Sequence, residues 1–256
     1  MKSLEFFQFL CPPDNYCVLV HDAETGQTAT IDAPEAGAIQ AALTEKGWAL
    51  THILVTHHHG DHTAGNLALK AKYDCEIVGP ESERDRIPGL TLGVREGSPL
   101  TFAGRRIQVL ETPGHTLGHV TYYLPESGVA FTGDTLFSLG CGRLFEGDAQ
   151  TMWSSLQKIA ALPGSTQMYC GHEYTLSNAK FALSVDGSNR DLQKRAADAE
   201  RLRSNQQHTL PTTLAAEKRT NPFLRPHDPN IRDHLKLDGA RDWQVFARLR
   251  ELKNKS

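Results

Sequence analysis

The sequence lacks the features that mark membrane and secreted proteins. It contains no run of about 18 apolar residues, the length that a membrane helix needs. Its N-terminus, MKSLEFFQFLCPPDN, has neither the positively charged region nor the long apolar core and small-residue cleavage site of a signal peptide. We therefore expect a soluble cytoplasmic protein that does not bind membranes.

Cysteine and basic charge are also scarce. The five cysteines are an odd number and include no C-x-x-C pair, a pattern that favours reduced thiols over a disulfide framework. The net charge of -3 gives no general electrostatic reason to bind nucleic acid. Cys141 and Cys170 are interpreted as small buried residues, and Arg105 and Arg106 in AGRRI are predicted to lie in a solvated hairpin turn.

The chain of 256 residues, 39% of them hydrophobic, is long enough for one large domain or for a domain with an appendage. Apolar runs separated by turn residues predict strands over 5–10, 16–22, 28–33, 52–56, 99–104, 105–112, 119–125, 128–134 and 166–171. Helical spacing predicts helices over 36–47, 64–74, 151–163, 175–187, 191–205 and 243–255. We expect an α/β domain over 1–173 and a helical domain over 174–256.

Histidine and aspartate residues follow the ends of four predicted strands. Four of these residues follow HILVT, and one follows each of the runs IQVLETPG, GVAFTG and TQMYCG. The full set is His57, His59, Asp61, His62, His115, Asp134 and His172. If these strands share a direction, their ends meet at one edge of the sheet, where α/β proteins usually place their sites. The set therefore predicts a metal site at this edge.

The number and spacing of these residues favour two metal ions. Just after a strand, His57 and His59 point the same way and can bind one ion, while Asp61 and His62 lie a turn further on and can serve a second. Catalytic zinc takes about three protein ligands and a water, so seven candidates exceed one site. Asp134, alone on its loop, is the natural bridge between ions about 3.5–4 Å apart. His58 is expected to have a structural role.

These motifs resemble those of a known superfamily. The chain resembles the metallo-β-lactamase superfamily in the order of four motifs, THHHGDH, TPGHT, FTGDTLF and CGHEYT. This resemblance covers roughly residues 4–175. Within the superfamily, the chain is similar to the hydroxyacylglutathione hydrolases, the glyoxalase II thioesterases, and this similarity extends to its C-terminus. The motifs that carry it are GCGRLFEG, TNPFLR and RELK. The resemblance implies a four-layered αββα sandwich with a C-terminal helical domain.

The resemblance also implies a role for each site residue. One ion would be held by His57, His59 and His115 and the other by Asp61, His62 and His172, with Asp134 bridging. The substrate would lie against Arg143, Phe145, His172, Tyr174, Arg250 and Lys253. Relatives carry lysine and tyrosine where this chain has Arg143 and Phe145, so the charge is kept and a hydroxyl is lost. By sequence alone, Arg250 and Lys253 would be interpreted as a solvated helix face.

The activity implied by the resemblance is the hydrolysis of S-D-lactoylglutathione to D-lactate and glutathione, a step of methylglyoxal detoxification. A hydroxide bridging two divalent ions would attack the thioester carbonyl, with Asp61 and Asp134 as the catalytic carboxylates. Zinc is the metal expected first, with iron and manganese as alternatives. We expect a monomer that acts on a small glutathione thioester and binds no nucleic acid.

Four other functions share the metal motif or part of it. A glutathione persulfide dioxygenase would use a single iron and usually lacks the helical tail. A β-lactamase would be expected to replace the bridging aspartate by cysteine or to lack His62, and a nuclease of the superfamily would need a basic surface. A metal-binding protein without catalytic activity is the non-enzymatic alternative, and the complete ligand set argues against it.

Overall fold

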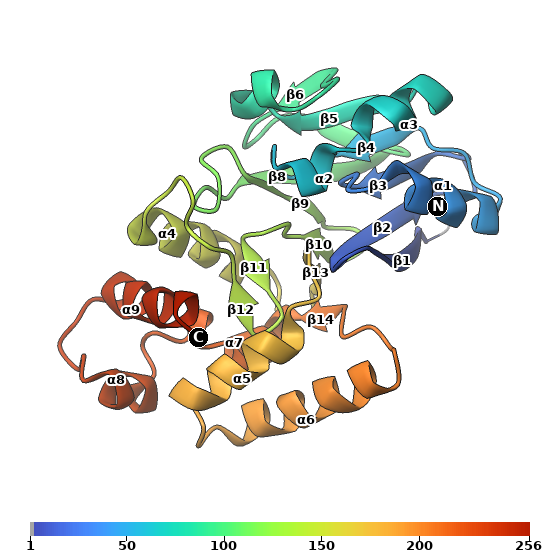
Figure 1. The fold of residues 1–256 in the computed structure, drawn as a ribbon. Helices are drawn as coiled ribbons and strands as arrows, with labels where there is room; N and C mark the ends of the chain where they lie inside the picture. Colours follow the sequence, from blue (N-terminus) through green and yellow to red (C-terminus); the bar gives the residue numbers. More distant parts are fainter. Residues whose placement is uncertain (1–2) are drawn as a thin grey trace. The chain divides into compact units, whose positions relative to one another are not determined.

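A computed structural model describes residues 3–256 as two compact units (Figure 1). The first unit contains residues 3–111 and Gly118–Gly133, and the second contains Thr112–Leu117 and Asp134–Ser256. The short segment Thr112–Leu117 thus belongs with the C-terminal half of the chain. Within residues 3–256, no helix combines the length and the apolar character that crossing a membrane requires.

Six strands form the first sheet of the first unit, in the order β1-β2-β3-β4-β5-β6. They are β1 (Glu5–Cys11), β2 (Asn15–His21), β3 (Thr28–Ile31), β4 (His52–Leu54), β5 (Glu76–Pro80) and β6 (Leu92–Val94). β1, β2 and β3 pair antiparallel, whereas β3, β4, β5 and β6 pair parallel. Every residue of β2 is buried, which fits the apolar run that predicted this strand.

Helical segments of the first unit are α1 (Ala36–Lys46), α2 (Gly60–Thr63), α3 (Asn66–Tyr73) and η1 (Glu81–Arg86). α1 confirms the helix predicted over 36–47. The Glu35 carboxylate accepts hydrogen bonds from the amides of Gly37 and Ala38, at 2.7 and 2.6 Å, and so caps the positive end of the helix. Gly47, where the predicted helix ends, has the left-handed conformation of a helix C-cap.

A second set of strands in the first unit is an antiparallel meander in the order β7-β8-β9-β10. Its members are β7 (Leu100–Phe102), β8 (Arg105–Glu111), β9 (Val120–Leu124) and β10 (Val129–Phe131), which confirm four predicted strands. The ring centroid of Phe6 in β1 lies 6.4 Å from that of Phe131 in β10. The Tyr122 hydroxyl donates to the carbonyl of Val55 at 2.8 Å. The two sheets therefore pack against each other.

The prediction that Arg105 and Arg106 lie in a solvated hairpin turn was wrong about the turn, because both lie on β8, and wrong about solvation for Arg105. Arg106 is exposed, but the Arg105 side chain is buried, and its Nη1 lies 3.0 Å from Asp22 Oδ1. Hydrogen bonds from Thr25 and then from Arg105 hold the pKa of Asp22 below its ordinary value. The residues alternate along β8, so the two neighbouring arginines lie on opposite faces of the strand.

Helices make up most of the second unit. They are α4 (Ala149–Ala160), α5 (Thr175–Val185), α6 (Arg190–Ser204), α7 (Leu214–Thr220), η2 (Pro222–Leu224), α8 (Pro229–Leu235) and α9 (Asp242–Asn254). Phe223 of η2 joins them, with its ring centroid 5.7 Å from that of Phe181 in α5 and 6.0 Å from that of Phe246 in α9. α4, α5, α6 and α9 confirm the four helices predicted from residue 151 onward.

Short strands complete the second unit. β11 (Leu136–Phe137) and β12 (Gly140–Cys141) form a hairpin, and β13 (Gln167–Tyr169) pairs antiparallel with β14 (Thr212–Thr213). The sequence predicted only β13 among these, because strands of two residues leave no alternating pattern. The domain boundary expected after residue 173 stays a prediction.

Candidate metal centre

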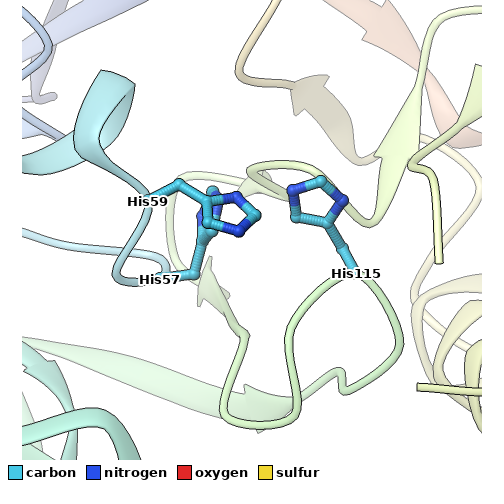
Figure 2. Close-up of side chains that lie close together, drawn as sticks. All are labelled: His57, His59 and His115. Atoms are coloured by element: carbon cyan, nitrogen blue, oxygen red, sulfur yellow. The ribbon is translucent and has the colours of Figure 1, made fainter. Parts of the chain in front are cut away.

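The first unit carries four of the predicted ligands just after β4. His57 and His59 lie in the loop, and Asp61 and His62 lie on α2. The His57 Nε2 and His59 Nδ1 atoms are 3.1 Å apart, and Figure 2 shows the two rings side by side. Two nitrogens bound to one tetrahedral zinc, each at 2.0–2.1 Å, would lie about 3.3 Å apart. This pair of nitrogens therefore fits a shared metal ion.

A carboxylate from the neighbouring strand orients His62. Asp32 directly follows β3, which runs parallel to β4, and its Oδ2 lies 2.8 Å from His62 Nδ1. The same carboxylate accepts hydrogen bonds from the Thr56 amide at 2.7 Å and from the Thr56 hydroxyl at 2.9 Å. Because Nδ1 of His62 is occupied, its Nε2 is the atom left for a metal, the arrangement found around many metal-bound histidines.

His58 faces a different partner from its neighbours in the loop. Its Nδ1 lies 2.9 Å from the Glu83 carboxylate, which also accepts from the His58 amide at 2.7 Å. Glu83 is buried and its other oxygen accepts from the Gly118 amide at 3.0 Å, so it ties two loops of the first unit together. These contacts agree with the structural role that the sequence predicted for His58.

The second unit brings its three predicted ligands together. His115 Nε2 and His172 Nε2 lie 3.3 and 3.4 Å from the same oxygen, Asp134 Oδ2. All three side chains are buried. His115 Nδ1 lies 2.9 Å from the carbonyl of Arg143, so its Nε2 is the nitrogen turned to Asp134. Figure 2 shows the His115 ring extending from the loop that carries it. One carboxylate between two imidazoles is the donor set expected around a bridging aspartate.

Close packing fixes the backbone at Asp134. Gly142 approaches so closely that a Cβ atom there would lie 1.9 Å from the Asp134 carbonyl oxygen. The preceding Gly133 has a φ of 46°, and a Cβ there would lie 2.6 Å from both His119 Nε2 and Thr56 Oγ1. Only glycine fits at these two positions, which explains the glycines of TGDT and GCGR.

The predicted substrate residues all belong to the second unit. Phe145 is 61% exposed, and its ring lies edge-on to His115 at 5.2 Å between centroids. The ring of Tyr174, which is 37% exposed, stacks on His172 at 4.7 Å. Aromatic surfaces thus lie beside two of the predicted metal ligands.

The predicted cations share one electrostatic environment. The Arg250 side chain is buried, and its Nη1 donates to the Cys141 carbonyl at 2.7 Å. Lys253 Nζ donates to the Ser177 hydroxyl at 2.8 Å. Burial, and then the charges of Arg250 and Arg143, lower the pKa of Lys253. The two arginines are thus close enough to Lys253 to lower its pKa, and positive charge gathers in this part of the second unit.

The buried thiols of Cys141 and Cys170 are expected to be unreactive near neutral pH. Burial raises the pKa of Cys141 to about 11 and that of Cys170 to about 12. Both thiols therefore stay protonated near neutral pH, and a protonated thiol is a poor nucleophile and ligand. This agrees with their interpretation as small buried residues.

Two family models match the chain. The model described as "Metallo-beta-lactamase superfamily" matches residues 24–172, and "Hydroxyacylglutathione hydrolase C-terminus" matches residues 173–256. A hydroxyacylglutathione hydrolase of Brucella anthropi is 55% identical over 251 residues, which cover 98% of this chain and 96% of that relative.

Solved structures show the same fold. ETHE1 from Myxococcus xanthus has a TM-score of 0.68 and 26% identity, covering 96% of this chain and 90% of its own. TTHA1623 in a di-iron-bound form has a TM-score of 0.60 and 27% identity, covering 85% of this chain and all of its own. These similarities confirm the expected metallo-β-lactamase fold with a C-terminal helical domain.

Proposed function

The chain belongs to the hydroxyacylglutathione hydrolase family of the metallo-β-lactamase superfamily, and from this membership we propose that it hydrolyses S-D-lactoylglutathione to D-lactate and glutathione. The observation that carries the proposal is the 55% identity over 98% of the chain. This similarity includes the helical part, which carries Tyr174, Arg250 and Lys253. ETHE1, at 26% identity, is a much more distant relative.

We propose that the ligand clusters of the two units together hold two divalent ions. One ion is assigned to His57, His59 and His115, the other to Asp61, His62 and His172, with Asp134 as the bridge. Imidazole nitrogen and carboxylate oxygen suit zinc, iron and manganese, and zinc is our first assignment. The pair of histidine nitrogens 3.1 Å apart in the first unit and the shared oxygen of Asp134 in the second support this division.

The chemistry needs a nucleophilic water and a stabilised oxyanion. Two bound divalent ions would lower the pKa of water and polarise the thioester carbonyl. The Asp61 side chain is 54% exposed, so it can accept a hydrogen bond from the attacking water and orient it. The new bond joins the water oxygen to the carbonyl carbon, and the carbon–sulfur bond breaks with its electron pair leaving on sulfur. The proton that the water loses passes to solvent, from which the thiolate can take up a proton. Because a thiolate leaves readily, the chain needs no separate general acid.

The cations of the second unit are proposed to bind the two carboxylates of the glutathione group. Among the residues that the structure describes, no carboxylate pairs with Arg143, Arg250 or Lys253. Of the three, only Arg250 is buried; a buried cation without an anionic partner is costly, and an anionic substrate would reduce that cost. Arg143 and Arg250 offer planar forks to a carboxylate, and Lys253 offers a point charge.

The test offers the purified protein S-D-lactoylglutathione and, separately, glutathione persulfide. We expect loss of the thioester absorbance with release of D-lactate, and no oxygen uptake with the persulfide. Oxygen uptake without thioester hydrolysis would replace the proposal by the dioxygenase alternative. We further propose that the enzyme acts as a cytoplasmic monomer in methylglyoxal detoxification, which rests on the sequence and on the family.

A further inference from the structure

The β11–β12 hairpin connects two parts of the proposed site. It begins two residues after Asp134 and ends two residues before Arg143. We propose that Glu217 and Asn221 are positioning residues that hold this hairpin, and through it Asp134 and Arg143, in the geometry needed for hydrolysis. The inference rests on the proposed function and adds to it two residues outside the metal and substrate sets.

The turn of the hairpin depends on support from other elements. The backbone of Leu139 has a φ of 58°, a left-handed conformation that residues other than glycine rarely adopt. Its amide donates to Glu217 Oε2 at 2.8 Å. The Asn221 Nδ2 donates to the carbonyls of Phe137 at 3.1 Å and of Gly140 at 3.0 Å. Side chains of the C-terminal helical segments thus bind the backbone on both strands and at the turn.

Glu217 and Asn221 act as one buried unit. Neither is exposed, and Asn221 Nδ2 lies 3.1 Å from Glu217 Oε2. The other Glu217 oxygen accepts from the Thr212 hydroxyl at 2.9 Å, and Asn221 Oδ1 accepts from the Phe223 amide at 3.0 Å. Each side chain is therefore fixed by a second contact, as a group that positions others must be.

Displacement of the hairpin would reach both ends of the site. The Gly142 amide donates to the Thr135 carbonyl at 3.2 Å, and Gly142 packs so closely on the Asp134 carbonyl that a Cβ atom there would clash with it. Next to Gly142, at the end of β12, the Cys141 carbonyl accepts from Arg250 Nη1 at 2.7 Å. A hairpin that shifts therefore moves a proposed metal ligand and a proposed substrate cation together.

The sharpest test is Asn221→Asp, because aspartate has the same shape as asparagine. Oδ1 can still accept the hydrogen bond from the Phe223 amide. The second carboxylate oxygen, however, replaces Nδ2 and faces the Phe137 and Gly140 carbonyls and the Glu217 carboxylate, all of which repel it. We expect the KM for S-D-lactoylglutathione to rise about tenfold or more, kcat to fall, and the Leu139 amide to exchange its hydrogen faster. Glu217→Gln keeps an oxygen for that amide, so it should be milder than Glu217→Ala.

Asn189→Ala is the matched control. Asn189 caps α6 in the same unit, where its Oδ1 accepts from the Leu192 amide at 3.1 Å. Its Nδ2 donates to the Arg219 carbonyl of α7 at 2.9 Å, so the variant loosens the helix that carries Glu217 without touching the hairpin. This variant should lower Tm and leave kcat, KM and exchange at Leu139 unchanged.

Three outcomes decide the inference. If Asn221→Asp folds and matches Asn189→Ala in kinetics and in exchange, the positioning role is refuted. If Asn221→Asp does not fold, the comparison of Glu217→Gln with Glu217→Ala decides in its place, and equal kinetics for the two would refute the role. If the wild-type protein does not hydrolyse the thioester, the proposed function fails instead, and hydrogen exchange alone decides whether the pair holds the hairpin.

Discussion

Arg250→Ala should weaken substrate binding much more than it slows the chemical step. The Arg250 guanidinium is buried and donates to the Cys141 carbonyl at 2.7 Å, which aims it from α9 toward the hairpin before Arg143. A charge-assisted hydrogen bond to a substrate carboxylate is worth about 1.5–3 kcal/mol. At about 1.4 kcal/mol for each factor of ten, KM should rise about tenfold to a hundredfold.

Steady-state kinetics with S-D-lactoylglutathione measure this effect, with Arg248→Ala as the control. Arg248 lies on the same helix, is 45% exposed and pairs only at the surface with Glu251 at 2.7 Å. A surface ion pair contributes less than about 1 kcal/mol, so this control should keep the wild-type KM. An Arg250→Ala protein that is folded and has an unchanged KM would remove Arg250 from the substrate site and refute the reasoning.

Other predictions concern metal affinity and stability. Asp32→Asn weakens the partner of His62 Nδ1, so a chelator competition should show metal affinity reduced about tenfold to a hundredfold; equal affinity would contradict the orienting role. Arg105→Ala leaves the buried Asp22 carboxylate unpaired and should lower the free energy of unfolding by about 3–5 kcal/mol in urea, without changing KM; a loss under 1 kcal/mol would contradict this. The pKa of Cys141 is raised to about 11, so the folded state keeps its proton to higher pH than the unfolded chain. The resulting stability is complete below about pH 9 and is lost by about 3 kcal/mol as pH rises through 11. Unfolding curves of Cys141→Ala should fall less steeply over this range, and parallel curves would refute the assignment.

The sequence was most informative where chemistry is concentrated in a short segment. His57, His59, Asp61 and His62 fall within six positions after one strand, and each has the side chain that a metal needs. Even the different role of His58 followed from the alternation of side chains in extended backbone. The long helices were equally accessible, because α5, α6 and α9 each carry a sustained pattern of buried residues.

The residues that the sequence did not reveal act through partners far along the chain. Asp32 reaches His62 across thirty positions, and Glu217 reaches Leu139 across 78. A single aspartate or glutamate in an ordinary segment gives no sign of such a partner. Asp32 follows β3, which ends at Ile31, but the strand predicted over 28–33 includes it, so the rule that found the other ligands passed over it. Arg105 was misplaced because its burial depends on the side of β8 that it occupies, which two adjacent arginines do not disclose.

The most direct test of the central claim is a metal titration of the chelated protein, followed by hydrolysis of S-D-lactoylglutathione. The ligand set is proposed to form a centre of two ions, so we predict full activity only when two equivalents of zinc per chain are bound. An Asp134→Ala protein should not reach this activity at any zinc concentration. Full activity at one equivalent, with no further binding at two, would contradict the proposed centre.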